Sequence, residues 1–362
     1  MAHATSTRKQ GPITANGESL QLHLGPTTEA EWDALLERAP GGGHVYQSFA
    51  WGEFKRRRGW RPLRVQLQQG PEAVGCGQIL LRSLGPLGLL GYCPKGPWID
   101  WDRPDHVRAF FKGLERLLTA AGVMLLRVEP EVLETRLDIQ RLLAELGFHE
   151  GRWNQQFKTT MMVDLTPPED RLFGSMKAQT RRNIRLANRH GITVEEDSSL
   201  ATREEFFRLF EATSRRDGFF MRPRRYIMEG WDALLRAGRG HVYVARHEGE
   251  MLAAMFACTF GKKFWYKDGA SSNAHRNYMP TYGLQWEVMK AMKSRGITLY
   301  DMVAIPDPDR LDDPTDSMHG LYRFKSGFGG SVTEFMRERV RWYRPRTGWL
   351  WYTLEPITYR IY

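Results

Sequence analysis

The sequence predicts a mixed α/β protein in which one structural plan occurs twice. Residues 63–67 and 74–81 read as two strands around a polar turn, and residues 242–245 and 251–260 repeat this hairpin pattern far downstream. Each hairpin leads into a helical pattern, an apolar strand and a helix end that closes in a Gly-Phe pair, so that each copy runs about 85 residues. Two tandem domains with mixed central sheets flanked by helices are therefore expected.

The elements after each hairpin follow in the same order. In the first copy, apolar periodicity predicts a helix, a strand and a helix end at residues 106–121, 123–128 and 143–148. In the second copy, the corresponding segments are residues 282–294, 297–303 and 324–328. Aligning the two Gly-Phe pairs places Glu145 opposite Lys325. Since the lysine occurs in the second copy alone, the chemistry is expected there.

The composition excludes several classes of protein. With 362 residues, 41% of them hydrophobic, the chain is long enough for two domains with cores of their own. It contains no long apolar run, and residues 1–28 lack a secretory pattern, so a cytoplasmic protein is expected. The three cysteines are far apart and indicate neither disulfides nor a metal site. The net charge of +10 favours an anionic partner. The candidates are nucleic acid, a phosphorylated substrate and the inner face of a membrane.

Lys325 lies between aromatic residues, just before a glycine run. Apolar neighbours lower the local dielectric, so an ammonium group beside Tyr322, Phe324 and Phe328 attracts a developing oxyanion more strongly than it would in water. This pattern predicts acyl transfer. The alternative interpretation is a lysine at a helix end, whose stem covers apolar surface while its head reaches solvent.

A basic helix is predicted between the two copies, over residues 176–191. Cations recur in it at every fourth position, as Lys177, Arg181, Arg185 and Arg189, and no acid occurs from residue 171 to residue 190. Residues spaced by four share one face of a helix, so these cations repel one another unless anions neutralise them. The stripe predicts an RNA backbone as partner, and a solvated helix face is the alternative.

The order of hairpin, helix, strand and helix is that of the acyltransferase fold called GNAT, whose splayed sheet opens a groove for an acyl donor. Ordinary members of this fold hold the coenzyme A pyrophosphate on a glycine-rich turn at a helix N-terminus. Here the corresponding turn contains Met279, Pro280 and Tyr282, which remove free N–H groups and close approach. Coenzyme A is therefore not the expected donor, and no cofactor is expected.

Several ordered motifs resemble the Fem aminoacyltransferases (the FemABX family), which add amino acids to the peptidoglycan precursor to build its interpeptide bridge. The resemblance covers nearly the whole chain and rests on residues 48–55, 95–100, 180–185, 216–226 and 322–325. A short, FemX-like form is expected, because no long heptad segment indicates the coiled-coil arm of some relatives.

The resemblance implies two GNAT-like domains with different tasks. The first, residues 1–160 plus 331–362, is expected to bind the precursor, and the second, residues 161–330, is expected to face the aminoacyl-tRNA. Lys325 is the expected catalytic residue, which stabilises the transition state. The residues expected to bind the precursor are Lys55, Arg222, Tyr226 and Tyr266, and those expected to bind tRNA are Lys177, Arg181, Arg185 and Arg189. If Arg222 and Tyr226 were helical, they would project from one face and grip a diphosphate together.

Two segments depart from the family pattern. A tyrosine expected near residues 266–271 is replaced by Asp268, which leaves Tyr266 alone in this segment. The glycines that often follow the family's Tyr-Asp pair are Val303 and Ala304 here.

The implied activity is that of a monomeric aminoacyltransferase that moves an amino acid from aminoacyl-tRNA to a side-chain amine of UDP-MurNAc-pentapeptide or lipid II. The ester on tRNA is already activated, and no Ser-His-Asp or Cys-His arrangement occurs at suitable spacing, so direct attack is expected. The candidate proton acceptors are Glu129, Asp100, water and the substrate itself. Three alternatives remain: a non-catalytic RNA-binding protein on a GNAT-like scaffold, an aminoacyl-tRNA transferase acting on protein N-termini, and an acyl-CoA enzyme with an unusual phosphate site.

Overall fold

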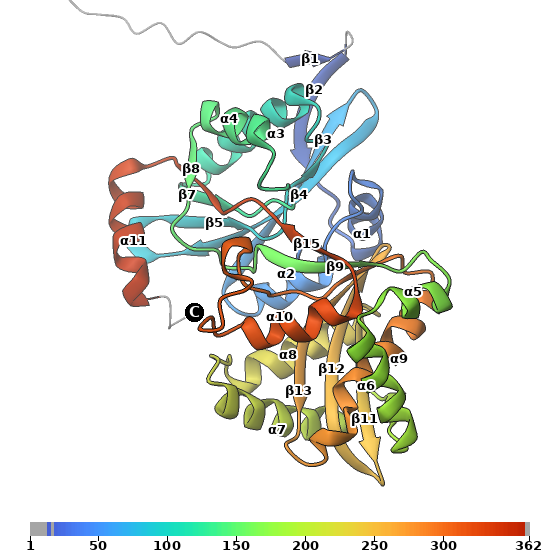
Figure 1. The fold of residues 1–362 in the computed structure, drawn as a ribbon. Coiled ribbons are helices and arrows are strands. Elements are labelled where there is room, and N and C mark those ends of the chain that lie inside the picture. Colours follow the sequence, from blue (N-terminus) through green and yellow to red (C-terminus); the bar gives the residue numbers. More distant parts are fainter. Residues whose placement is uncertain (1–12, 16–17, 359–362) are drawn as a thin grey trace, which may run out of the picture.

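The computed structural model describes residues 13–15 and 18–358, which form two mixed sheets with helices packed around them (Figure 1). In this part of the chain the first sheet has nine strands: β1 (Ile13–Ala15), β2 (Glu18–Leu24), β3 (Trp60–Gln69), β4 (Glu72–Ser83), β5 (Leu89–Cys93), β6 (Trp98–Ile99), β7 (Val123–Val128), β8 (Phe148–Glu150) and β16 (Arg339–Trp342). Their order is β1-β2-β3-β4-β5-β7-β16-β8, with β6 paired to β4.

The second sheet has seven described strands in the order β10-β11-β12-β13-β14-β9-β15. They are β9 (Thr159–Asp164), β10 (Thr193–Glu196), β11 (Gly240–His247), β12 (Glu250–Phe260), β13 (Lys263–Ser271), β14 (Leu299–Asp301) and β15 (Ser331–Glu334). The described α-helices are α1 (Glu29–Arg38), α2 (Phe49–Arg56), α3 (Pro104–Ala120), α4 (Leu137–Glu145), α5 (Glu169–Ser175), α6 (Ala178–Arg189), α7 (Leu200–Asp217), α8 (Arg224–Arg236), α9 (Pro280–Ser294), α10 (His319–Lys325) and α11 (Pro345–Thr358).

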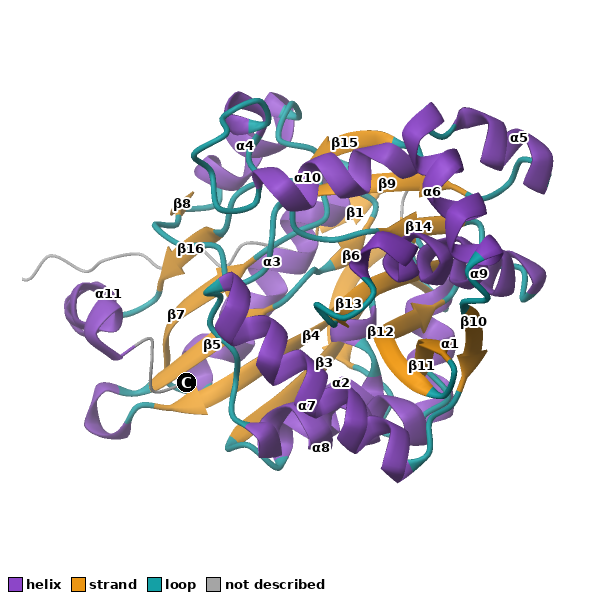
Figure 2. Ribbon diagram, turned by 60° about the horizontal axis from the view of Figure 1, so that its bottom comes forward, coloured by secondary structure: helices purple, strands orange, loops and turns teal. Residues whose placement is uncertain are grey.

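The two sheets repeat one topology, as the hairpin patterns predicted. In the first sheet β3, β4 and β5 are antiparallel and β5 then runs parallel to β7. In the second sheet β11, β12 and β13 are antiparallel and β13 runs parallel to β14. The predicted mixed α/β class is therefore confirmed, and in each sheet a helix crosses over between the two parallel strands (Figure 2).

The end of β14 differs from the prediction. The strand expected over residues 297–303 stops at Asp301, because Val303 and Ala304 adopt left-handed backbone conformations with φ of +54° and +40°. A left-handed backbone conformation cannot continue a strand, and it is unfavourable for any residue that has a Cβ atom. The chain therefore turns away from the sheet at this point.

One hydrophobic core joins the two halves of the chain. Trp32 of α1 and Phe54 of α2 belong to the same buried cluster as Phe206, Trp231 and Phe256 from the second half. After β15 has paired with β9 in the second sheet, the chain returns to the first sheet as β16 and then forms α11 (Figure 1). The division into domains at residues 160 and 331 stays a prediction.

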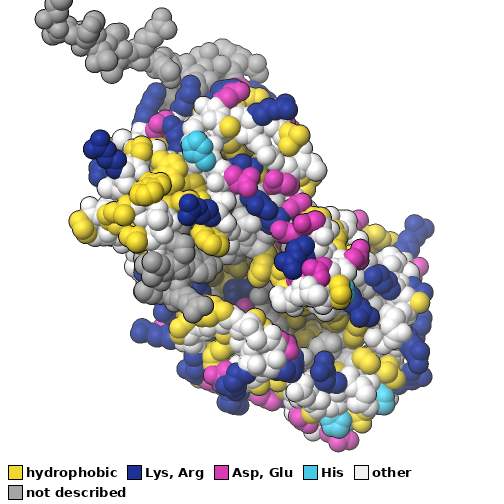
Figure 3. Space-filling model, turned by 60° about the vertical axis from the view of Figure 1, so that its left-hand side comes forward, with side chains coloured by type: hydrophobic (Ala, Val, Ile, Leu, Met, Phe, Trp, Pro, Cys, Tyr) yellow, Lys and Arg dark blue, Asp and Glu magenta, His cyan; other side chains and the backbone are white. Residues whose placement is uncertain are grey.

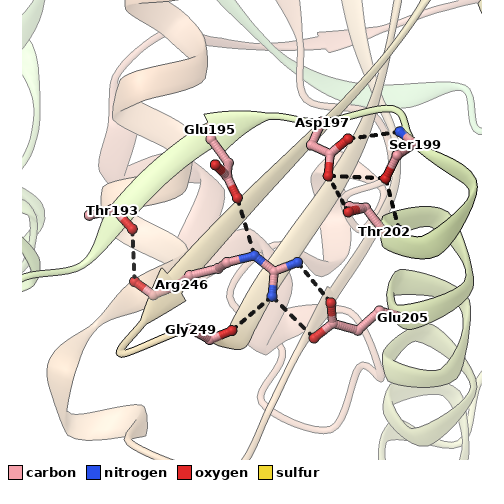
Figure 4. A network of polar contacts seen from close by, with 8 residues as sticks. All are labelled: Thr193, Glu195, Asp197, Ser199, Thr202, Glu205, Arg246 and Gly249. Carbon is pink, nitrogen blue, oxygen red and sulfur yellow. Dashed lines mark hydrogen bonds and ion pairs between the residues drawn. The ribbon is translucent and has the colours of Figure 1, made fainter.

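A polar network fixes the outer edge of the second sheet (Figure 4). The Arg246 guanidinium on β11 donates hydrogen bonds to Glu205 of α7 at 2.7 Å, to Glu195 of β10 at 3.2 Å and to the Gly249 carbonyl at 3.0 Å. Asp197 accepts hydrogen bonds from Ser199 and Thr202 at the start of α7. These contacts hold β10, the start of α7 and the β11–β12 turn in one arrangement.

Candidate functional site

Lys55, Tyr226 and Arg222 meet where α2 packs against α8. Lys55 Nζ donates a hydrogen bond to the Tyr226 hydroxyl at 3.2 Å, and the Arg222 guanidinium lies 5.6 Å from the centre of the Tyr226 ring. Arg222 precedes α8 instead of lying on it, so the prediction that Arg222 and Tyr226 project from one helix face is wrong. The two side chains are nevertheless adjacent. They line a cavity of about 140 Å³. Burial lowers the pKa of Lys55.

A second cavity, of about 220 Å³, lies beside the first. Its lining includes the charged residues Lys95, Lys267, Asp268 and Asp301. Lys267 and Asp268 line both cavities, and their ion pair of 2.6 Å therefore forms the wall between them. Asp268 also accepts a hydrogen bond from Trp231 Nε1 at 2.7 Å, which fixes this wall to the core. Cationic side chains therefore line both cavities, Arg222 the first and Lys95 the second.

Lys325 is buried at the end of α10, with 3% of its surface exposed. Its Nζ donates hydrogen bonds to the carbonyl oxygens of Val303 at 2.5 Å and Ala304 at 2.9 Å. Burial lowers the pKa of Lys325 to about 7, and the nearby Asp301 carboxylate opposes this effect. The alternative of a solvent-reaching lysine is therefore wrong, because the head group is enclosed.

The aromatic neighbours of Lys325 differ from those expected. The Tyr266 ring lies 5.6 Å from Lys325 Nζ, whereas Phe324 and Phe328 pack with Tyr282. Tyr266 thus belongs to the Lys325 end of the site rather than to the Lys55 end. Burial raises the pKa of Tyr266 to about 12, so the ring keeps its hydroxyl proton.

Asp301 lies near Lys325 and lines the second cavity. It is 5% exposed and accepts hydrogen bonds from the Thr160 hydroxyl and from the Val303 N–H, the latter at 2.7 Å. Burial raises the pKa of this carboxyl group, and Glu131 adds to the effect. A carboxylate with a raised pKa beside a cavity is suited to accept a proton.

The two proposed proton acceptors from the sequence lie elsewhere. Glu129 accepts hydrogen bonds from the Tyr92 hydroxyl and from the backbone N–H groups of Gln155 and Gln156. Asp100 accepts a hydrogen bond from the Asp102 N–H at 3.0 Å in a turn. Neither carboxylate lines either of the two cavities.

The basic stripe lies on α6 but is divided in the structure. Arg185 and Arg189 join Arg182 and Asn188 around an open surface hollow of about 420 Å³. Arg181 instead donates hydrogen bonds to the carbonyl oxygens of Gly174 and Met176. The cations available to a large anion are therefore Arg182, Arg185 and Arg189.

The start of the stripe touches the segment that carries Lys325. Lys177 Nζ donates a hydrogen bond to Ser326 Oγ at 2.9 Å, and the Lys177 N–H donates to the Gly327 carbonyl. A chain of phosphates lying along α6 would therefore end beside Lys325.

The turn before α9 also departs from an ordinary phosphate loop, since Met279, at φ +58°, and Pro280 open that helix.

Sequence reasoning missed Lys95, Lys267 and Asp301. Asp301 follows an apolar strand, which is a recognisable signal, because side chains after the ends of central strands often line sites. Lys95 lies in the motif of residues 95–100, but the motif did not indicate that its side chain lines a cavity. Its left-handed backbone, with φ of +48°, and its hydrogen bond to the Phe157 carbonyl at 2.8 Å depend on tertiary contacts.

Comparison with known proteins gives two family matches. Residues 27–145 match the FemAB family, and residues 174–326 match the acetyltransferase (GNAT) domain family. The chain is thus related to the FemAB family. The predicted resemblance and GNAT-like fold are confirmed at this level. The FemAB match lies within the first sheet and its helices, and the GNAT match includes α6 and Lys325.

Individual relatives extend over most of this FemAB-related chain. The lipid II:glycine glycyltransferase of Staphylococcus aureus is 24% identical over 88% of this chain and 91% of its own length. A crystal structure of FemX has a TM-score of 0.82 at 22% identity and covers 92% of this chain and 100% of that one. A tandem GNAT protein of the clavulanic acid biosynthesis pathway has a TM-score of 0.52 at 11% identity, over 90% and 98% of the two chains.

Two properties of the residues that the structure describes bear on membranes and metals. No helix among them has the length and apolar character needed to cross a bilayer. The same residues contain no group of three or more His, Cys, Asp or Glu side chains placed to hold a metal ion.

Replacing Ala304 by glycine should stabilise the protein. Ala304 has a φ of +40°, a conformation that costs an L-residue about 1 kcal/mol and glycine almost nothing. We expect the free energy of unfolding of Ala304→Gly to rise by up to about 1 kcal/mol in urea titrations. The matched control is Ala257→Gly on β12, which should lose about 1 kcal/mol. Equal losses in both variants would contradict the account of strain at residues 303 and 304.

Proposed function

We propose that this chain is an aminoacyltransferase that moves an amino acid from aminoacyl-tRNA to a side-chain amine of a peptidoglycan precursor, in the formation of the interpeptide bridge. The observation that carries the proposal is the enclosed Lys325, whose carbonyl partner Val303 lines the same cavity as Asp301. The name of the Staphylococcus aureus relative supports lipid II as the acceptor class.

The acceptor is proposed to lie along the two cavities. Lys55, Arg222 and Tyr226 would hold the phosphates and sugar at one end, since a guanidinium and an ammonium group favour phosphate oxygens. The peptide would then pass the Lys267–Asp268 pair and reach the cavity that contains Lys95 and Asp301. Lys95 has no carboxylate partner among the described residues, and it would bind a carboxylate of the stem peptide.

The donor is proposed to approach from α6. Arg182, Arg185 and Arg189 would neutralise phosphates of the RNA, and the contact of Lys177 with Ser326 would bring the aminoacylated end to Lys325. We propose that residues 161–330 serve the donor and that residues 1–160 with 331–362 serve the acceptor. The shared core holds the two parts together.

The chemistry follows from this placement. The acceptor amine attacks the ester carbonyl, so that a C–N bond forms while the carbonyl π electrons move onto oxygen. Two of the three N–H groups of the Lys325 ammonium donate to the carbonyl oxygens of Val303 and Ala304, which leaves the third to stabilise this oxyanion. Asp301 accepts the amine proton. The oxyanion electrons then re-form the carbonyl bond, the C–O bond to the ribose breaks, and the ribose oxygen takes the proton and leaves as a hydroxyl. No covalent enzyme intermediate is needed, because the ester is already activated.

Replacing Lys325 by methionine should abolish transfer while acceptor binding stays nearly unchanged. Loss of a donor to the oxyanion costs roughly 100- to 1000-fold in rate. Since the pKa of Lys325 is about 7, the wild-type rate should also fall as the pH rises through 7 and the ammonium loses its proton. Initial rates of transfer from charged tRNA and calorimetric binding of the acceptor check both points. Wild-type turnover in Lys325→Met, with Lys262→Met as the exposed control, would refute the role.

Replacing Asp301 by asparagine should lower kcat by roughly 100-fold, because the amide keeps the shape of the carboxyl group but cannot take a proton. Thr160→Val serves as the control, since it removes a hydrogen bond to the same carboxylate and leaves the carboxylate in place. The two variants are compared in kcat and in thermal unfolding. A loss of stability in Asp301→Asn without a loss of kcat would assign Asp301 a structural role alone.

Replacing Arg182, Arg185 and Arg189 by glutamine should weaken RNA binding and make it less dependent on salt. Each lost phosphate contact lowers the log–log salt slope by roughly 1. The control replaces three exposed arginines elsewhere, Arg38, Arg116 and Arg141. Tight RNA binding by the wild type without any aminoacylated product would favour the non-catalytic RNA-binding alternative.

A further inference from the structure

The helix α11 is apolar on two opposite sides. Its inner side places Trp351 and Tyr352 in a buried cluster with residues of β5, β7 and β16. Its outer side exposes Trp349, Leu350 and Leu354 by 61%, 42% and 40%. The outer side of a surface helix is ordinarily polar, because it faces water. The outer side of α11 therefore suits a partner that takes up apolar side chains.

The surroundings of this face are basic. Arg337, Arg339 and Arg341 form ion pairs with Glu150 or Glu115, whereas the exposed Arg344 and Arg346 form none with the side chains that the structure describes. The exposed Arg152 also lies here, since its N–H donates to the Tyr352 hydroxyl at 2.6 Å and its guanidinium lies 4.8 Å from that ring. Figure 3 shows hydrophobic side chains gathered on this side of the molecule, with lysine or arginine side chains between them.

This combination fits a lipid surface better than a nucleic acid or a protein core. A tryptophan and two leucines on one helix face can enter the boundary between head groups and acyl chains. Arginines at the rim of the face are attracted to anionic head groups, and each contributes roughly tenfold or less in affinity. Leucine offers no stacking surface for a base, so an RNA partner would leave most of this apolar face unused.

The inner side of α11 is also connected, through one aromatic side chain, to the proposed phosphate end of the acceptor site. Trp60 packs against the cluster that contains Trp351 and Tyr352, and its ring lies 5.4 Å from Lys55 Nζ. A protein resting on a membrane through α11 would thus hold Lys55 on the same side of the molecule. In a lipid-linked precursor the diphosphate lies at the level of the head groups. This step rests on the proposed function, whereas the two preceding observations do not.

We propose that the outer side of α11, with Trp349, Leu350, Leu354, Arg344 and Arg346, docks on an anionic lipid surface. The helix lies on the membrane and does not cross it. The docking brings the acceptor cavity to the level at which a lipid-linked diphosphate is found.

Vesicle binding by the full-length protein tests this proposal. The protein is sedimented with vesicles of phosphatidylcholine alone or mixed with phosphatidylglycerol. The wild type should bind the mixed vesicles, and the triple variant Trp349→Ser, Leu350→Ser, Leu354→Ser should bind roughly tenfold more weakly. The double variant Arg344→Gln, Arg346→Gln should lose the preference for the anionic vesicles.

Matched controls separate the face from general hydrophobicity. Leu24, Leu137 and Leu200 are exposed by 65%, 57% and 61% on other elements, and their replacement by serine should leave binding unchanged. Transfer to a soluble, nucleotide-linked acceptor should be equal in the wild type and the α11 variants. Vesicle binding without any transfer would contradict the proposed function and leave the docking face standing.

Two results would overturn the docking proposal. One is equal binding of the wild type and the triple serine variant to the mixed vesicles. The other is that the wild type self-associates in sedimentation velocity runs without vesicles, whereas the triple serine variant does not. This result would show that a second copy of the chain covers this face.

Discussion

The buried ammonium group of Lys325 is the interaction on which the site depends. A cation with 3% exposure needs acceptors, and the chain supplies them by turning Val303 and Ala304 into left-handed conformations, so that both carbonyl oxygens point at Nζ. The same turn ends β14 at Asp301 and leaves its carboxylate beside the cavity. Backbone strain, charge burial and the position of the Asp301 carboxylate are therefore one arrangement, and each part would be unfavourable without the others.

Charge organises the rest of the molecule around this point. The Lys267–Asp268 pair lines both cavities, of which Arg222 lines the first and Lys95 the second. On the outside, Arg182, Arg185 and Arg189 of α6 surround an open surface hollow. The cations behind the net charge of +10 thus lie in separate places, which explains why a single overall figure could not choose among anionic partners.

Local patterns were enough to predict much of the fold. The two hairpins follow from alternation around polar turns, and β7 begins and ends where its apolar run does, at Val123 and Val128. The strands β5 and β13 were not predicted, because their neighbours in the sheets, more than their own sequence, determine them. The repeat in the sequence predicted that the chemistry lies in the second copy, which carries Lys325. The sequence could not predict the contact between Lys325 and the Tyr266 ring, nor the position of Asp301 near Lys325. The elements that carry these residues, β13, β14 and α10, meet only in the folded chain. The same limit applies to α11, where the sequence shows apolar residues but not which side of the helix they face.

The most direct test of the central claim is mass spectrometry of a peptidoglycan precursor incubated with this protein and either charged tRNA or the corresponding aminoacyl thioester of coenzyme A. The arrangement of α6, Lys325 and the turn before α9 predicts that the precursor gains the mass of an amino acid residue on its side-chain amine with charged tRNA and gains nothing with the thioester. Modification by the thioester, or no modification with any charged tRNA, would contradict it.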